Sequence, residues 1–139
     1  MDKAQTAFVE LSDTSFVYGG KDGGTLAVEG LNLSVNEGGF VSVVGPSGCG
    51  KSTLMKMVTG LVPVTKGTVR VAGNVVNGPV KIVGMAFQNA TLLPWRTTLD
   101  NVMLPLEIVE PYRSRLRAER EQYEARARAL LETVGLKGF

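Results

Sequence analysis

The residues best suited to chemistry form one short stretch, Gly45 to Thr53, which reads GPSGCGKST. It fits the pattern G-x-x-x-x-G-K-[ST], in which a glycine-rich turn leads into a helix. The glycines at positions 45, 48 and 50 allow backbone conformations that a Cβ would forbid, so successive N–H groups can point toward one anion. Lys51 can reach the β- and γ-phosphates of a nucleotide, and the Ser52 hydroxyl can ligate Mg²⁺. The stretch therefore predicts a phosphate-binding loop.

The residues on either side of this phosphate loop predict the elements that position it. Residues 40–44 are a short apolar, β-branched run, which is typical of a buried strand. Residues 52–59 can continue from the loop as a helix, and we expect Gly60 to end it. Residues 81–87 form a second apolar run, a predicted strand that ends at Gln88. A strand, a glycine loop and a helix in this order favour phosphate binding over a glycine-rich turn that matches by chance.

The rest of the chain predicts a β-rich beginning and a helical end. We expect short strands at residues 8–11, 16–18, 25–28 and 31–35, mostly antiparallel, and a further strand at residues 67–71. A short helix through residues 102–104 would be capped by Thr98 or Asp100. Residues 114–134 predict one charged amphipathic helix, with an Arg120–Glu124 pair on its exposed side and Gly135 at its end.

Composition limits the possible function classes. The chain has 139 residues, of which 44% are hydrophobic and 20% charged, values typical of one modest globular domain. A net charge of +2 is too small to indicate a nucleic-acid partner, and interleaved glutamates make the Arg113–Arg117 run a solvated helix face. Cys49 is the single cysteine, so an internal disulfide is excluded and a small loop-filling role is expected. No apolar stretch reaches the length of a membrane helix, so any membrane contact would be through a partner.

Several motifs at this spacing together resemble the ATP-binding subunit of an ABC transporter. The loop reads GPSGCGKSTL, close to the family's usual wording, and Tyr18 lies upstream where the family carries an aromatic that stacks on adenine. Gln88 ends an apolar run, as does the family's Q-loop glutamine, which contacts Mg²⁺ and the attacking water. The following QNATLLPWRTTLDNV is similar to ATPases of nitrate, sulfonate, taurine and pyrimidine-precursor importers.

The resemblance implies an α/β fold, a P-loop core with an antiparallel β subdomain, truncated relative to an intact ABC-type ATPase domain. Residues 1–88 would form the β subdomain and the phosphate-loop core, and residues 89–139 the Q-loop and the start of a helical subdomain. The implied ligands are ATP and Mg²⁺, with Ser52 and Gln88 on the metal and Gln88 as the catalytic residue. The implied nucleotide-binding residues are Tyr18, Gly45, Pro46, Ser47, Gly48, Cys49, Gly50, Lys51, Ser52 and Thr53.

The resemblance also implies partners and a location. The segment Leu92–Leu104 would meet a membrane permease, and a second ATPase subunit would complete a dimer around two ATP molecules. The protein would then be cytoplasmic and peripheral on the inner face of the cell membrane, attached through the permease. The sequence of this chain does not identify the transported solute, because in this family the permease and the binding protein select it.

Some of the family's motifs do not occur in this sequence. There is no LSGGQ-type signature, no apolar strand ending in Asp then Glu, and no histidine. In the family the Asp-Glu strand lies beside the phosphate-loop strand. We therefore expect the N-terminal half of an ABC ATPase that does not hydrolyse ATP alone. A non-catalytic nucleotide-binding or regulatory module stays open, and a small P-loop kinase is disfavoured because no arginine-bearing lid lies near the loop.

Overall fold

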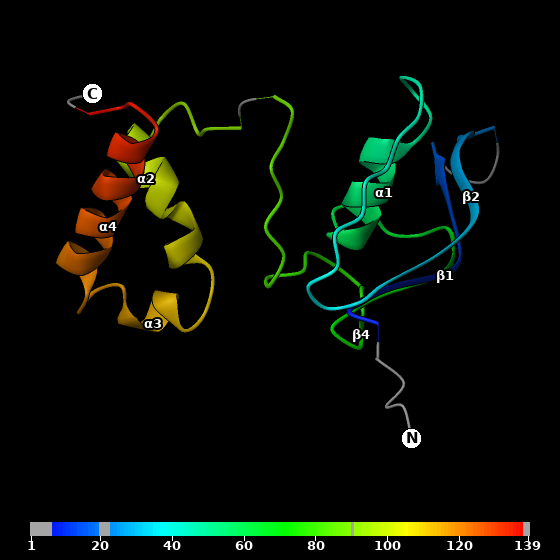
Figure 1. The fold of residues 1–139 in the computed structure, drawn as a ribbon, viewed down its shortest axis with the longest axis horizontal. Coiled ribbons are helices and arrows are strands. Elements are labelled where there is room, and N and C mark those ends of the chain that lie inside the picture. Colours follow the sequence, from blue (N-terminus) through cyan, green and yellow to red (C-terminus); the bar gives the residue numbers. More distant parts are fainter. Residues whose placement is uncertain (1–6, 20–22, 90, 138–139) are drawn as a thin grey trace. The chain divides into compact units, whose positions relative to one another are not determined.

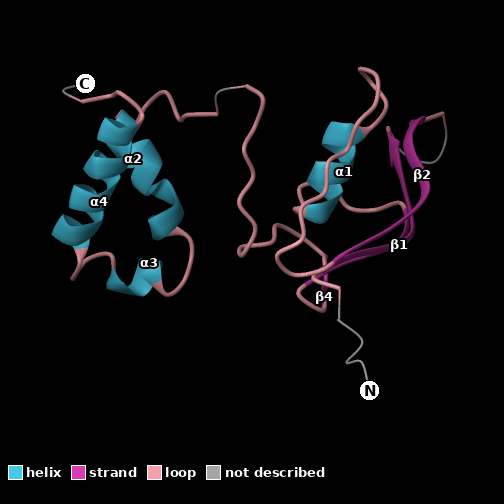
Figure 2. Ribbon diagram, in the orientation of Figure 1, coloured by secondary structure: helices cyan, strands magenta, loops and turns pink. Residues whose placement is uncertain are grey.

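The computed structural model of this chain describes residues 7–19, 23–89 and 91–137. Its contacts divide the chain into two compact units, Met1–Met85 and Ala86–Phe139. Figure 2 shows that the described strands all belong to the first unit, where one helix accompanies them, whereas the second unit is helical. The α/β fold class predicted from the sequence is confirmed.

The first unit is built on a four-stranded sheet in the order β2-β1-β3-β4. The strands are β1 (Val9–Tyr18), β2 (Thr25–Val35), β3 (Lys66–Val71) and β4 (Asn74–Val75), and all three neighbouring pairs are antiparallel. The antiparallel prediction is therefore confirmed, but the four short strands expected at the start are two long ones. Their pairing contains register shifts around Thr14, next to the positive φ of Asp13, so each strand bends where the sequence pattern suggested a gap.

Helix α1 (Lys51–Val58) packs on this sheet and supplies much of its core. Leu54 and Met57 are buried with Leu11, Phe16 and Val69, which come from β1 and β3. Figure 1 shows α1 lying beside the sheet. The predicted stop at Gly60 is confirmed, because Gly60 has φ +72 and the N–H groups of residues 60 and 61 bond back to the carbonyls of residues 57 and 56.

The two apolar strands predicted at residues 40–44 and 81–87 are wrong. Both segments are without regular structure, and the side chains of Phe40 and Val44 are 95% and 90% exposed. A strand needs a neighbour for its N–H and C=O groups, and the described part of the chain places none beside either segment. The hydrophobic pattern shows that these segments are apolar enough to be buried, but a strand forms only when another strand pairs with it.

The second unit contains α2 (Thr98–Met103), a 3₁₀ turn η1 (Leu104–Glu107), α3 (Tyr112–Arg115) and α4 (Arg120–Thr133). The N-cap of α2 is Thr97 rather than the predicted Thr98 or Asp100, and its hydroxyl accepts from the Asp100 N–H at 3.1 Å. Met103 and Ala127 are buried where α2 and α4 meet. Over the ranges that the structure describes, no helix is long and apolar enough to cross a membrane.

The single helix predicted over residues 114–134 is wrong, because the chain turns between Arg115 and Arg120. The ring centroids of Tyr112 and Tyr123 lie 6.1 Å apart in an edge-to-face contact. In one straight helix, residues eleven apart would be separated by about 16 Å along the axis. The turn is therefore what brings these rings together. The predicted Arg120–Glu124 pair (2.8 Å) and the stop at Gly135 are confirmed.

Candidate nucleotide-binding site

The phosphate loop joins α1 through a glycine that no other residue type would replace easily. Gly50 is the N-cap of α1 with φ +93 and ψ 2, a left-handed conformation that costs a side-chain-bearing residue about 1–2 kcal/mol. A Cβ at this position would lie 2.4 Å from the carbonyl oxygen of Ala27 on β2. Gly48 is also left-handed, with φ +82, but a Cβ there would meet nothing within 4 Å. The loop thus rests against the sheet at Gly50 and is open at Gly48.

Lys51, the first residue of α1, turns its side chain back over the loop. Its ammonium donates to the carbonyl oxygens of Gly45 at 2.8 Å and Pro46 at 2.6 Å, and lies 3.5 Å from the Cys49 Sγ. An ammonium has three N–H donors, and these three contacts use all of them. A phosphate that binds Lys51 must therefore exchange with the loop's own carbonyls. These contacts hold the positive charge of Lys51 over the phosphate loop.

The two hydroxyls that follow Lys51 differ in their surroundings. Ser52 is exposed, and its hydroxyl makes no hydrogen bond within the part of the chain described. Thr53 is 6% exposed, and its hydroxyl pairs with the Tyr18 hydroxyl at 3.1 Å. At the start of a helix, where backbone N–H groups have no helical partners, these hydroxyls add to an anion-binding end. Ser47, an exposed residue of the same loop, completes the polar side chains there.

Tyr18 lies at the end of β1 and is linked to both the core and α1. Its ring meets the edge of the Phe16 ring, with centroids 4.7 Å apart and planes at 88°. The residue is 41% exposed, so part of the ring surface faces solvent. The structure thus brings Tyr18 to the beginning of the phosphate-loop helix, 35 residues further along the chain. A sequence pattern could not reveal the Tyr18–Thr53 contact, because neither residue carries a spacing signal for the other.

Gln88 belongs to the second unit, where it is exposed and lies outside any helix or strand. The phosphate loop belongs to the first unit. Among the described residues, no three Cys, Asp or Glu side chains are grouped to hold a metal ion. Magnesium that binds together with a nucleotide takes most of its ligands from phosphates and water, so it does not require a cluster of protein carboxylates.

Hydrogen bonds of the Asn101 side chain hold together the segment expected to meet a permease. Sequence reasoning missed this residue. The Asn101 carboxamide accepts from the Leu93 N–H at 2.7 Å and donates to the carbonyls of Leu93, Arg96 and Thr97 at 3.1, 3.3 and 2.9 Å. Trp95 stands at the tip of the loop so formed and is 76% exposed. A lone asparagine inside a predicted short helix carries no pattern that reports such bonds.

Arg96 in the same loop forms a two-pronged ion pair with Glu107. The guanidinium nitrogens lie 2.8 and 3.0 Å from the two carboxylate oxygens. The hydrogen bond from Arg96 lowers the pKa of Glu107 below its usual value, and the same bond raises the pKa of Arg96. The pair ties the loop to η1, so residues 93–107 form one connected substructure.

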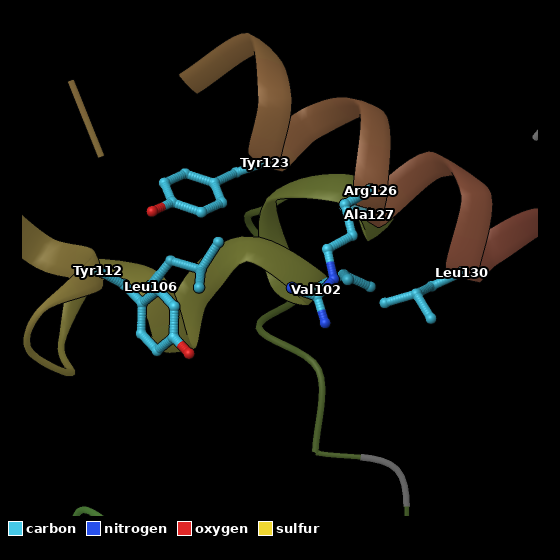
Figure 3. Close-up of a pocket in the computed structure, with 7 residues that line it drawn as sticks. All are labelled: Val102, Leu106, Tyr112, Tyr123, Arg126, Ala127 and Leu130. Carbon is cyan, nitrogen blue, oxygen red and sulfur yellow. The ribbon is translucent and has the colours of Figure 1, made fainter. Parts of the chain in front are cut away.

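A cavity of about 270 Å³ lies between the helices of the second unit (Figure 3). Its walls are mostly apolar, with two phenol rings and one guanidinium among them. Figure 3 shows the Tyr112 ring, from α3, and the Tyr123 ring, from α4, near Leu106, and the two rings meet edge to face. Glu119 accepts a hydrogen bond from the Tyr123 hydroxyl at 2.5 Å and raises the pKa of that phenol. The lining residues are Val102, Leu106, Tyr112, Tyr123, Arg126, Ala127 and Leu130.

Comparison with known proteins adds three findings. Residues 28–139 match the family model described as ABC transporter. The bicarbonate transport ATP-binding protein CmpD of Synechocystis is 44% identical over 108 residues, which are 78% of this chain and 38% of that protein. The taurine import ATP-binding protein TauB of Escherichia coli K12 is 40% identical over 121 residues, which are 87% of this chain and 43% of that protein.

Among solved structures, the dimeric post-hydrolysis state of the ATP-binding cassette MJ0796, bound to ADP and Pi, aligns with a TM-score of 0.74. That chain is 30% identical, and the alignment covers 94% of this chain and 58% of that one. The chain spans about two fifths of the length of CmpD and of TauB.

Proposed function

This chain belongs to the ABC transporter family, and we propose that it binds ATP as part of the ATP-binding subunit of a solute importer. The observation that carries the proposal is the phosphate loop running directly into α1, with Lys51 over the loop and Ser52 exposed beside it. The sequence resemblance to that family, drawn from the loop, Tyr18 and Gln88, agrees with the family match.

In this proposal different groups of the chain bind the phosphates, the base and the metal ion of the nucleotide. Backbone N–H groups of residues 47–53 surround the phosphates, and Lys51 exchanges its loop carbonyls for phosphate oxygens. Tyr18 offers the exposed part of its ring to the adenine. Ser52 and Gln88 serve as Mg²⁺ ligands, and Gln88 orients the attacking water in the complete subunit. Phosphoryl transfer depends mainly on positioning and charge neutralisation, which are the tasks of these groups.

The proposed partners follow from the relatives, which are named as ATP-binding proteins of bicarbonate transport and taurine import. We propose that the segment Leu92–Leu104 contacts a membrane permease, with Trp95 the most exposed apolar side chain of that segment. A second ATPase subunit would close the nucleotide site, and the MJ0796 cassette is described as dimeric. The protein would then be cytoplasmic and attached to the inner face of the membrane through the permease.

The test is titration of the chain with MANT-ATP, a fluorescent ATP analogue, in three versions. Lys51→Ala removes the ammonium from the loop, and Lys56→Ala removes an ammonium from the same helix away from the loop. Because charge-assisted hydrogen bonds contribute about 1.5–3 kcal/mol each, we expect Lys51→Ala to weaken binding at least tenfold. Lys56→Ala should bind as the wild type does. Equal affinity of the Lys51 variant and the wild type would disprove the nucleotide-site proposal.

A further inference from the structure

The hydroxyl of Tyr18 connects β1 to the phosphate-loop helix. Tyr18 Oη and Thr53 Oγ1 lie 3.1 Å apart, a hydrogen bond in which either group can donate. Thr53 is the third residue of α1 and is buried, so this bond lies at the protected base of the loop. The Tyr18 ring is restrained a second time by the edge-to-face contact with Phe16, a core residue. The ring is therefore fixed by two contacts in different directions.

The position of Thr53 in α1 explains why its hydroxyl is available to Tyr18. Thr59 and Thr133, at the C-terminal ends of α1 and α4, turn their hydroxyls back to the carbonyl four residues earlier, each at 2.9 Å. Thr53 is the third residue of α1, so the residue four positions earlier, Cys49, precedes the N-cap of the helix. The Thr53 hydroxyl pairs with Tyr18, at the residue next to the candidate Mg²⁺ ligand.

The bond to Tyr18 also leaves Thr53 able to contact a phosphate. A hydroxyl donates once and accepts twice. If Tyr18 donates, Thr53 keeps its own proton for a phosphate oxygen, and the Tyr18–Thr53 bond survives nucleotide binding. Phenylalanine at position 18 would retain an aromatic face and the contact with Phe16, but would lose this link. The hydroxyl of Tyr18 thus has a role separate from that of its ring.

We propose that the Tyr18 hydroxyl is a positioning group that fixes the base-stacking ring relative to the phosphate loop through Thr53. The inference rests on the proposed ATP-binding function and adds a determinant of affinity for the base half of the nucleotide. With the Tyr18–Thr53 hydrogen bond in place, the ring keeps a fixed distance from the phosphate loop. A nucleotide can then contact the ring with its base and the loop with its phosphates at the same time. Without this hydrogen bond, the ring can pivot about Phe16, and part of the stacking is lost.

The experiment compares two ligands that differ in the base. MANT-ATP affinity is measured by fluorescence titration, and the affinity of inorganic tripolyphosphate by its competition with MANT-ATP. The variants are Tyr18→Phe, Thr53→Val and the double variant, with Thr53→Ser as the conservative replacement that keeps a hydroxyl. Tyr112→Phe is the matched control, because it removes a tyrosine hydroxyl in the second unit. Thermal unfolding of each variant, followed by far-UV circular dichroism, identifies any that fail to fold.

We expect Tyr18→Phe to weaken MANT-ATP binding about threefold to tenfold, the range that one neutral hydrogen bond gives. Its loss of tripolyphosphate affinity should be smaller, because that ligand has no base to stack. The double variant should bind MANT-ATP no more weakly than Thr53→Val, whereas Thr53→Ser should restore most of the affinity. Tyr112→Phe should match the wild type.

Three results would overturn the inference: wild-type affinity in Tyr18→Phe, equal losses for both ligands, or losses that simply multiply in the double variant. If Tyr18→Phe or Thr53→Val unfolds, the MANT-ATP affinity of Thr53→Ser still tests the inference. A complete loss of affinity in Thr53→Ser, which keeps the hydroxyl, would contradict it. A wild-type chain that binds no MANT-ATP would overturn the proposed function and the inference with it. Saturable binding that is insensitive to Tyr18→Phe would overturn the inference alone.

Discussion

Two glycines of the phosphate loop share one backbone conformation but differ in their surroundings, which makes them a matched pair for mutation. Gly48 and Gly50 have φ +82 and +93. An alanine at either position pays the left-handed strain of about 1–2 kcal/mol. Only at position 50 does the added Cβ meet a backbone atom, the Ala27 oxygen, at 2.4 Å. Ordinary van der Waals contact begins near 3.4 Å, so the loop or β2 must move by about 1 Å.

We therefore expect Gly50→Ala to be the more damaging substitution. Forcing atoms into a closely packed place typically adds about 1–3 kcal/mol to the strain that both variants carry. Gly48→Ala should lower the free energy of unfolding of the first unit by about 1–2 kcal/mol, and Gly50→Ala by roughly 2–5 kcal/mol. Because the displaced loop carries Lys51, Gly50→Ala should also weaken MANT-ATP binding more than Gly48→Ala does.

The assay is urea unfolding followed by far-UV circular dichroism, together with MANT-ATP titration of the same samples. The comparison of the two variants cancels the conformational strain and isolates the contact with Ala27. Equal losses of stability in Gly48→Ala and Gly50→Ala would refute the reasoning, since the packing against β2 would then contribute nothing.

Three further predictions concern the second unit and the chemistry. The lowered pKa of Glu107 means that its ion pair with Arg96 stabilises the fold above the carboxyl's usual value of 4.5 and is lost as the pH falls through the lowered value. The gap in unfolding midpoint between wild type and Glu107→Gln should therefore close below about pH 4.5, and a gap that persists in acid would contradict the pairing. In the complete subunit, Trp95→Ala should reduce co-purification of the proposed permease while leaving MANT-ATP affinity nearly intact; equal losses of both would indicate misfolding instead. The 139-residue chain alone should release no phosphate from Mg-ATP above the level of the Lys51→Ala variant, because the family's Asp-Glu pair and signature string do not occur in it, and sustained turnover would disprove this.

Sequence reasoning was most accurate where structure is local. The glycine pattern of residues 45–50, the helix that follows and its end at Gly60 depend on backbone conformations that the residue types themselves impose. The antiparallel pairing of β1 with β2 also agrees, because these two strands are consecutive in the chain. Boundaries were less accurate, as the cap at Thr97 shows.

The failures occurred where a segment depends on something distant. Residues 40–44 and 81–87 are apolar enough for strands, yet a strand exists only when another segment pairs with it. Residues 114–134 have helical periodicity throughout, but the chain turns between Arg115 and Arg120, and this turn brings Tyr123 into contact with Tyr112. The bonds of Thr53 to Tyr18 and of Asn101 to the loop before it were unpredictable for the same reason, since each depends on how elements pack.

The Asn101 carboxamide has a thermodynamic consequence for any protein that meets the loop bearing Trp95. Ordering a flexible residue costs roughly 1–2 kcal/mol of backbone conformational entropy, and a binding loop usually loses that entropy at the moment of association. Here the backbone at Leu93, Arg96 and Thr97 is already restrained by the bonds of one side chain. The entropy has been lost during folding, so the indole is presented by a preorganised loop. Association can then proceed as a rigid-body encounter, without waiting for the loop to order.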